Sequence, residues 1–178
     1  MTYQIHTADS APEDSKPLLE KSVASFGMIP NLHGVMAESP QALEGYQTLH
    51  TLAQQTAFNA DELTVVWQTI NVEHACHYCV PAHSAIAKKM GVDDSLVAAL
   101  RNREAMPTAR LQALHDTVLL IVRERGVVAK DKLNAFYEAG YSHRNVLDII
   151  LILAQKVMSN YTNHVGETEL DKAFAAFK

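Results

Sequence analysis

The sequence predicts a single all-α domain, on three observations. No stretch alternates between apolar and polar residues in the manner of a strand bounded by tight turns. Apolar residues instead recur three and four positions apart along most of the chain, as on one face of a helix. The 178 residues are 48% hydrophobic and 20% charged, which suits one globular domain with a sizeable core. We expect one helical domain over residues 1–178, with residues 1–12 as a loosely ordered N-terminal arm.

Four helices are predicted before the cysteine-containing segment. They are a helix over 13–26, a short helix from Pro30 to Met36, a helix that begins at Ser39-Pro40, and a helix capped by Asn59 or Asp61. Each carries apolar residues at helical spacing. In the third helix, for example, Leu43, Tyr46 and Leu49 form an apolar stripe.

The second half of the chain predicts a further series of helices. They run from the cysteines to Met90, over 93–100, from Pro107 to a stop at Gly126, over 130–140, from a Ser142 cap to about Asn160, and from Glu169 to Phe177 after a Thr168 cap. The apolar run VLDIILILA at 146–154 is far shorter than the roughly 20 residues that a membrane span needs. It predicts a helix that is buried on most sides.

Charge and the N-terminal sequence exclude several classes of protein. The net charge of −5 and the pI of about 6.0 argue against a surface for nucleic acids or anionic membranes. The polar, acidic N-terminus does not resemble a secretory signal. We therefore expect a cytoplasmic protein, where a close pair of cysteines is more often catalytic or metal-binding than structural.

Both cysteines lie in the stretch EHACHYCVPAH, residues 73–83, with the spacing Cys76-x-x-Cys79-x-x-x-His83. Pro81 is comfortable only in the first turn of a helix, so the helix should begin close to Tyr78. The cysteines then lie at or just before a helix N-terminus. There, free N–H groups and the helix dipole lower the pKa of a thiol and favour its reactive thiolate form.

This segment supports a metal site or a redox site. Five side chains could bind zinc, which takes four ligands: His74, Cys76, His77, Cys79 and His83. However, structural zinc sites usually draw a second pair of ligands from a distant segment, and the sequence has no second Cys-x-x-Cys. The corresponding function would be a non-enzymatic zinc- or thiol-based redox sensor.

The redox interpretation explains more of the segment. Cys79 as a thiolate would split the O–O bond of a peroxide and become a sulfenic acid, which Cys76 would condense into a disulfide. His83 lies one helical turn after Cys79 and could relay a proton, and an external dithiol would reset the pair. A general thiol–disulfide oxidoreductase using the same two cysteines is the alternative within the enzyme class.

The stretch WQTINVEHACHYCVPAHSAIAKKMG resembles the Cys-x-x-Cys-x-x-x-His signature of the alkylhydroperoxidase D / carboxymuconolactone decarboxylase family. FGMIPNLHGVMAESPQALEGY at 26–46 and NYTNHVGETELD at 160–171 are similar to segments of its peroxidase-related members. The resemblance implies an all-helical bundle of that family's type, with its core region at about 40–125, assembled as trimers or hexamers. It also implies an antioxidant peroxidase with Cys79 peroxidatic, Cys76 resolving and His83 in the proton relay.

The expected partners are a hydroperoxide substrate and an external dithiol or thioredoxin-like reductant, with no cofactor and no metal. One departure from the family concerns the relay glutamate, because Thr64 stands at its position. Glu62 lies two residues earlier, and Glu73 lies just ahead of the cysteines. Either glutamate could replace it, and we take Glu73 as the fourth candidate catalytic residue; the alternative for Glu73 is a solvated charge at a helix end.

Several other residues are expected to have structural roles or receive no role. Tyr78 could hydrogen-bond a peroxide oxygen but is expected to be structural, and Trp67 is expected in the core. His164, with Asn160 and Asn163, could form a polar cluster near the site or at a subunit contact. No role is assigned to four isolated histidines: His33, His50, His115 and His143.

Overall fold

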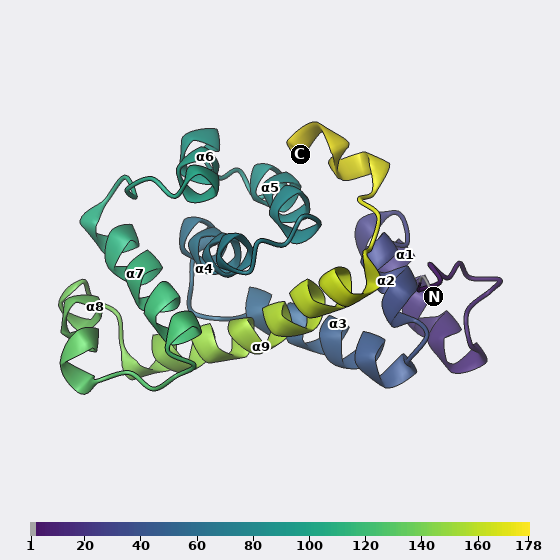
Figure 1. The fold of residues 1–178 in the computed structure, drawn as a ribbon, viewed down its shortest axis with the longest axis horizontal. Coiled ribbons are helices and arrows are strands. Elements are labelled where there is room, and N and C mark those ends of the chain that lie inside the picture. The colour runs from purple at the N-terminus through teal and green to yellow at the C-terminus, as the bar shows by residue number, and fades with distance from the viewer. Residues whose placement is uncertain (1–2) are drawn as a thin grey trace.

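The computed structural model describes residues 3–178, and every regular element in that range is helical. Figure 1 shows an elongated bundle with the long α9 along its base. In order, the elements are the 3₁₀ turn η1 (Glu13–Ser15), α1 (Lys16–Phe26), α2 (Asn31–Met36), α3 (Pro40–Gln54), α4 (Ala60–Glu73), α5 (Cys79–Lys89), α6 (Asp94–Asn102), α7 (Ala109–Arg123), η2 (Lys130–Leu133), α8 (Asn134–Glu138), α9 (His143–Gly166) and η3 (Lys172–Phe177). The predicted all-α fold is confirmed.

Helix α4 forms the centre of the molecule. It packs against α5, α6, α7 and α9, and it is buried along nearly its whole length. The helix starts at a capping box, in which the Asn59 side chain accepts the Glu62 backbone N–H at 2.9 Å and the Glu62 carboxylate accepts the Asn59 N–H at 3.1 Å. Of the two caps predicted for this helix, Asn59 is therefore the one used.

Replacing Asn59 by Ala is expected to lower the free energy of unfolding by about 1 kcal/mol, because a helix end loses the acceptor for an otherwise unpaired N–H. Urea titration followed by circular dichroism measures the loss. Asn102→Ala is the matched control, since the one partner of its exposed side chain among residues 3–178 is the exposed Glu104. An equal change in the two variants would contradict a special role for the cap.

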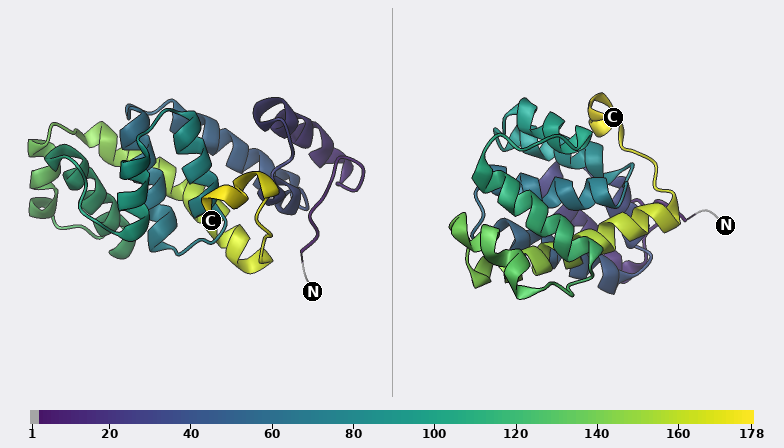
Figure 2. Two further views of the ribbon diagram at one scale, coloured as in Figure 1. Left: turned by 90° about the horizontal axis from the view of Figure 1, so that it is seen from above. Right: turned by 60° about the vertical axis from the view of Figure 1, so that its left-hand side comes forward.

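Two hydrophobic clusters make up the core. The larger one surrounds α4 with side chains of α6, α7, α8 and the first half of α9. The smaller one joins α1, α2 and α3 to the start of α5, and it contains both cysteines. Helices α3 and α9 pack along each other (Figure 2). Both helices contribute side chains to both clusters. The cysteines therefore sit beside the N-terminal helices.

The segment ahead of η1 runs along α2. The His6 backbone N–H donates to the Gly34 carbonyl at 3.1 Å, and the His6 ring bonds Glu38 at 2.7 Å. A Cβ on Gly34 would lie 2.8 Å from the His6 carbonyl oxygen, so this close approach requires glycine. Residues 1–2 of the expected arm lie outside the described residues, and the domain boundaries stay a prediction.

The C-terminal part departs from the predicted elements. Helix α9 continues to Gly166 rather than ending near Asn160, because Asn160 and Asn163 face the interior and make buried contacts there. The helix predicted from Thr168 is replaced by an extended stretch and the 3₁₀ segment η3. The Asp171 carboxylate binds the Asn31 N–H at 3.1 Å and the Tyr78 hydroxyl, which ties this stretch to α2 and α5.

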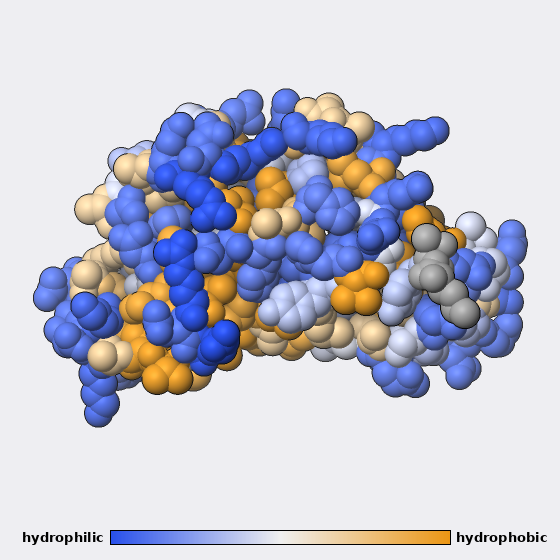
Figure 3. Space-filling model, in the orientation of Figure 1, coloured by the Kyte–Doolittle hydropathy of each residue, from blue (hydrophilic) through white to orange (hydrophobic). Residues whose placement is uncertain are grey.

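Some large apolar residues lie on the surface, and α9 carries more of them than any other helix. The exposed large side chains of this helix are Leu147, Ile150, Tyr161 and Val165. Figure 3 shows hydrophobic side chains gathered at the lower left, where α7, α8 and the start of α9 lie. Helix α9 is thus less buried than its sequence predicts. Among residues 3–178, no helix is long and apolar enough to cross a membrane.

Candidate functional site

The two thiols are held in the connection between α4 and α5. Helix α4 ends at Glu73, and Ala75 takes a left-handed backbone conformation (φ 51°) that turns the chain back. Cys79 is the first residue of α5, so the predicted helix start near Tyr78 is confirmed. The Cys79 backbone N–H donates to the Cys76 sulfur at 3.2 Å. Both cysteines are free and almost fully buried, with exposed fractions of 1% and 2%.

Helix α9 supplies polar side chains to the same place. The Asn163 amide donates to the Cys79 sulfur at 3.2 Å and lies 3.9 Å from the Cys76 sulfur. Lys156 lies two turns earlier on that face and donates to His83 Nε2 at 2.8 Å. Residues 156, 160 and 163 share one helical face because they are spaced four and three apart. The site is therefore built between the start of α5 and the second half of α9.

Cys79 is the thiol that this environment ionises. Burial raises its pKa. A hydrogen bond with Cys76 and the charge of Lys156 act against burial, as do hydrogen bonds with Ser159 and Asn160, and the resulting pKa of Cys79 is about 5. The pKa of Cys76 is raised, first by its hydrogen bond with Cys79, then by burial and by the charge of the Cys79 thiolate. The pair of cysteines thus carries one negative charge, with Cys79 as the thiolate and Cys76 as the neutral thiol.

His83 is held as a neutral imidazole. Burial, followed by the nearby charges of Lys156 and His50, lowers the pKa of His83 well below its usual value. The ring lies edge-on to Trp67, with centroids 4.8 Å apart. Within the described chain, His83 Nδ1 has no hydrogen-bond partner, although it is buried. This nitrogen is therefore free to bond to a substrate.

The two candidate relay glutamates lie elsewhere. The Glu73 carboxylate accepts hydrogen bonds from Arg123 at 2.7 and 2.9 Å and from Arg103 at 3.2 Å. These arginines lower the pKa of Glu73 and fix it on the α7 side of α4. Glu62 bonds Arg110 and Tyr141 at the opposite end of α4 from the cysteines. The structure thus brings together Cys76, Cys79 and His83, but it does not bring Glu73 to them.

The other polar residues of the cysteine segment have structural partners. The Tyr78 hydroxyl donates to Asp171 and accepts the Leu32 N–H, as expected for a structural tyrosine. His74 donates to Asn160 Oδ1 at 2.9 Å and His77 to the Thr168 carbonyl at 3.0 Å. Within residues 3–178, no three His, Cys, Asp or Glu side chains are grouped so that they could hold a metal ion. The five donors considered for zinc therefore do not converge on one point, since His74 and His77 bond to Asn160 and Thr168.

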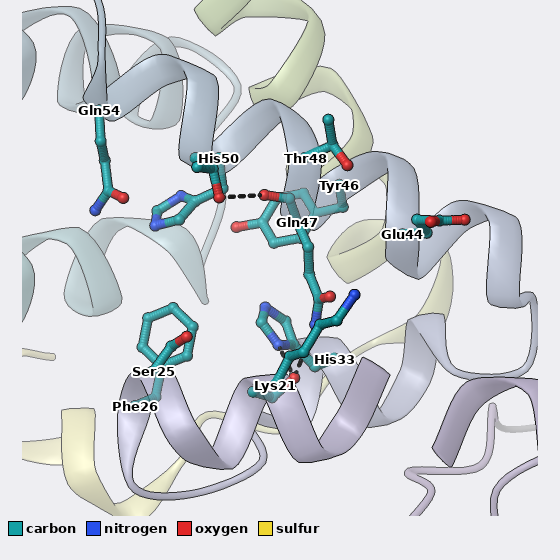
Figure 4. Close-up of a pocket in the computed structure, with 12 residues that line it drawn as sticks. Lys21, Ser25, Phe26, His33, Glu44, Tyr46, Gln47, Thr48, His50 and Gln54 are labelled. Carbon is teal, nitrogen blue, oxygen red and sulfur yellow. Dashed lines mark hydrogen bonds between the residues drawn. The ribbon is translucent and has the colours of Figure 1, made fainter. Parts of the chain in front are cut away.

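Two adjoining hollows lead toward Cys79. The inner chamber, of about 40 Å³, is lined by Cys79, His83 and mostly apolar or aromatic side chains. The outer cavity, of about 340 Å³, lies between α1 and α3. Four residues line both hollows: Phe26, His33, Tyr46 and His50. Figure 4 shows the rings of Phe26, His33 and His50 directed into the outer cavity, which gives Cys79 an aromatic approach from solvent.

Several residues of this site are absent from the sequence-based prediction. Lys156 stands two residues after the apolar run VLDIILILA at 146–154, and its signal is its spacing of four from the buried Ile152. His50 continues the inward stripe of Leu43 and Tyr46 on α3. Asn160 and Asn163 do lie near the thiols, whereas His164 is exposed.

Comparisons with known proteins give structural matches. No protein-family profile and no curated protein sequence matches the chain. The crystal structure of an alkylhydroperoxidase AhpD core, an uncharacterized peroxidase-related protein from Ralstonia eutropha JMP134, has a TM-score of 0.84 at 18% identity and covers 97% of this chain and 93% of that chain. An uncharacterized peroxidase-related protein from Silicibacter sp. TM1040 has a TM-score of 0.81 at 19% identity, with 99% and 96% covered.

A third similar structure is a variant of the debrominase Bmp8 in complex with 2,3,4-tribromopyrrole. Its TM-score is 0.80 at 15% identity, and the match covers 99% of this chain and 95% of that chain. At such identities the likeness concerns the fold, and it confirms the all-helical architecture that the sequence resemblance implied. Since the same fold serves a debrominase, the reaction must be argued from the site itself.

Proposed function

We propose that this chain, which has the fold of the alkylhydroperoxidase AhpD core, is a thiol-dependent peroxidase. The observation that carries the proposal is the pairing of an ionised thiol, Cys79, with a second thiol, Cys76, whose sulfur accepts the Cys79 N–H at 3.2 Å. A low-pKa thiolate beside a resolving thiol is the arrangement that splits peroxides. An aromatic-lined cavity connects Cys79 with the solvent, and its size supports a small substrate.

The reaction proceeds in two steps before the reset. The Cys79 thiolate attacks the outer peroxide oxygen, the O–O bond breaks, and the site donates one proton to the leaving alkoxide. Cys79 is now a sulfenic acid. The Cys76 sulfur then attacks the Cys79 sulfur, and water leaves with the Cys76 proton. The balance is one hydroperoxide and two thiol equivalents giving one alcohol, one water and one disulfide.

The dimensions of the site favour small, apolar hydroperoxides. A chamber of about 40 Å³ holds a peroxide group, because a single water needs only about 10–15 Å³. The alkyl or aryl part would lie among Phe26, Tyr46 and His50 toward the outer cavity. Burial favours binding of apolar groups there. The substrate is therefore expected to carry its apolar part directly on the peroxide.

The reductant is expected to be a small dithiol. Both thiols are at most 2% exposed, so a folded protein partner cannot reach the Cys76–Cys79 disulfide without a rearrangement of its surroundings. A small dithiol can enter through the same cavity as the substrate and exchange with the disulfide. The same burial disfavours a general thiol–disulfide oxidoreductase that acts on protein disulfides.

Consumption of cumene hydroperoxide with excess dihydrolipoamide tests the proposal. Wild type is expected to turn over, and Cys79→Ser to show no consumption above the uncatalysed background. Cys76→Ser is expected to lose only part of the turnover, because excess dithiol can reduce the Cys79 sulfenic acid directly. Without dithiol, this variant should stop after one turnover, with a sulfenic acid that a dimedone-type reagent traps on Cys79. Chelator treatment should leave the wild-type rate unchanged.

Other outcomes point to the remaining candidates. No turnover by wild type, with a tightly held metal that needs both cysteines, would identify the zinc-based sensor. Reduction of a small disulfide without any peroxide turnover would identify a thiol–disulfide oxidoreductase. Turnover that survives Cys79→Ser would contradict the assignment of the peroxidatic thiol.

The aromatic lining of the chamber supports a second candidate, reductive dehalogenation of a small aromatic halide. Here the Cys79 thiolate would take the halogen, the ring carbon would gain a proton, and Cys76 would displace halide to form the disulfide. The balance is one aryl halide and two thiols giving an arene, a hydrogen halide and a disulfide. Release of bromide from 2,3,4-tribromopyrrole, in the same assay without peroxide, distinguishes this activity.

Self-association remains part of the proposal. The apolar residues exposed on α9, such as Leu147, Ile150 and Tyr161, support a homo-oligomer, because a helix of this character is usually covered. The order of assembly, trimer or hexamer, stays a prediction.

A further inference from the structure

Lys156 is a buried charge whose role the sequence does not reveal. Its side chain has an exposed fraction of 0%, and its one hydrogen-bond partner among residues 3–178 is His83 Nε2 at 2.8 Å. No carboxylate in that part of the chain forms an ion pair with it. A buried ammonium without a counter-charge is costly, so such lysines normally pair or lose their proton.

The Cys79 thiolate is the anion available to balance Lys156. The charge of Lys156 lowers the pKa of Cys79, and the two cysteines oppose the lowering of the Lys156 pKa that burial causes. The other titratable groups at the thiols and the chamber come from α2, α3, α5 and the loop before α5. They are His33 on α2, Tyr46 and His50 on α3, His83 on α5, and Cys76 and Tyr78 just before α5; α4 contributes neutral Trp67, Gln68 and Asn71.

We infer that Lys156 stores the proton that the reaction consumes and delivers it through His83, in place of the carboxylate that the site lacks. In the reduced protein, Lys156 is an ammonium and Cys79 a thiolate, so the site is neutral overall. The ammonium donates to His83 Nε2, which leaves the ring hydrogen on Nδ1, the nitrogen without a protein partner. His83 lines the chamber and can pass this hydrogen to the substrate.

The proton balance follows from this arrangement. When Cys79 attacks the peroxide, His83 gives its Nδ1 hydrogen to the alkoxide and takes one from Lys156 at Nε2, which leaves a neutral amine. Disulfide formation then releases water with the Cys76 proton. Reduction by a dithiol brings two protons, of which one returns to Cys76 and one to Lys156. Lys156 is thus charged when the thiols are reduced and neutral when they form the disulfide.

The delivery of the proton to a peroxide rests on the proposed function, but the pairing of Lys156 with the thiolate does not. The test therefore begins without peroxide. In reduced protein, the rate of Cys79 alkylation by iodoacetamide is followed against pH, together with the ultraviolet absorbance of the thiolate. Wild type is expected to have its midpoint at about pH 5.

Lys156→Met is expected to slow alkylation at about pH 6 by at least about tenfold, because losing the positive charge raises the pKa of Cys79 by about two units or more. Lys89→Met, which removes an exposed charge from α5, should leave the profile unchanged. Lys156→Arg keeps the charge but cannot release a proton at these pH values. It should keep the low midpoint and lose peroxide turnover by at least about tenfold.

Two results would overturn the inference. One is an ordinary midpoint near pH 8 to 9 in wild type, which needs no variant to fold. The other is an unchanged midpoint in a folded Lys156→Met variant. A low, Lys156-dependent midpoint in a protein that consumes no peroxide would leave the ion pair standing and would refute only the peroxidase.

Discussion

A His83→Phe variant is expected to reduce cumene hydroperoxide at least about 100-fold more slowly than wild type, with its fold intact. Loss of a positioned proton donor typically costs two to four orders of magnitude. Phenylalanine preserves the edge-on contact with Trp67, where the ring centroids are 4.8 Å apart. It removes both ring nitrogens, however, and with them the link between Lys156 and the chamber.

The identity of the leaving group tells whether the loss is one of proton donation. An alkyl hydroperoxide releases an alkoxide, which must be protonated as it leaves, whereas a peroxy acid releases a carboxylate, which need not be. His83→Phe should therefore lose far more activity with cumene hydroperoxide than with a small peroxy acid. Equal losses with the two oxidants would show that His83 acts only by packing.

His143→Phe provides the matched control, because His143 is an exposed histidine at the opposite end of α9 from the site. Its replacement is expected to leave both rates unchanged. The stalled sulfenic acid of Cys76→Ser adds a second readout. Rapid-mixing measurement of its formation separates the peroxide step from the later reset by the dithiol.

Much of the fold follows from local signals in the sequence. Asn59 with Glu62 defines the start of α4, and Pro81 sets the start of α5 one residue after Tyr78. Both signals act within one turn of helix, so they can be recognised without knowledge of the tertiary structure. The end of the chain was predicted less well because the Asp171 carboxylate, instead of capping a helix, is bound to Asn31 and Tyr78 far along the chain.

The candidate site likewise combines residues of one local segment with residues that only tertiary packing brings to it. Cys76, Cys79 and His83 belong to one short segment, and their spacing predicted their proximity. Lys156 and Asn163 come from a helix about eighty residues later, and only the packing of α9 against α5 brings them to the thiols.

Glu73 shows why nearness in sequence is a poor guide to a relay group. It stands three residues before Cys76, yet the reversal at Ala75 places the cysteines on another side of α4. Arg103 and Arg123 hold its carboxylate there. No local pattern announces arginines that lie thirty and fifty residues further along the chain. The charged group at the thiols is instead a lysine within an apolar helix.

That lysine also leads to an expected loss of stability. In Cys79→Ser, Lys156 has no anion to balance it, and the variant is expected to be less stable than reduced wild type by about 3 kcal/mol near neutral pH, as when one partner of a buried ion pair is removed. Lys156→Met in the Cys79→Ser background should restore most of this loss. Lys156→Met alone should cost little, because Cys79 can then take up a proton and become a neutral thiol.

The direction in which the stability of Cys79→Ser changes with pH follows from the lowered pKa of Lys156. Burial lowers the pKa of Lys156 below its ordinary value of 10.5, so below that pH the unfolded Cys79→Ser chain binds more protons than the folded chain. Its stability should therefore rise as the pH is raised toward about 10, and fall as the pH is lowered.

Urea unfolding of the four proteins of this cycle, at several pH values under reducing conditions, measures both effects. Lys89→Met in the Cys79→Ser background is the control and should restore nothing. If Lys156→Met changed stability equally in the two backgrounds, the lysine and the thiolate would not be partners, and the low pKa of Cys79 would have to come from Asn160, Ser159 and Cys76 alone.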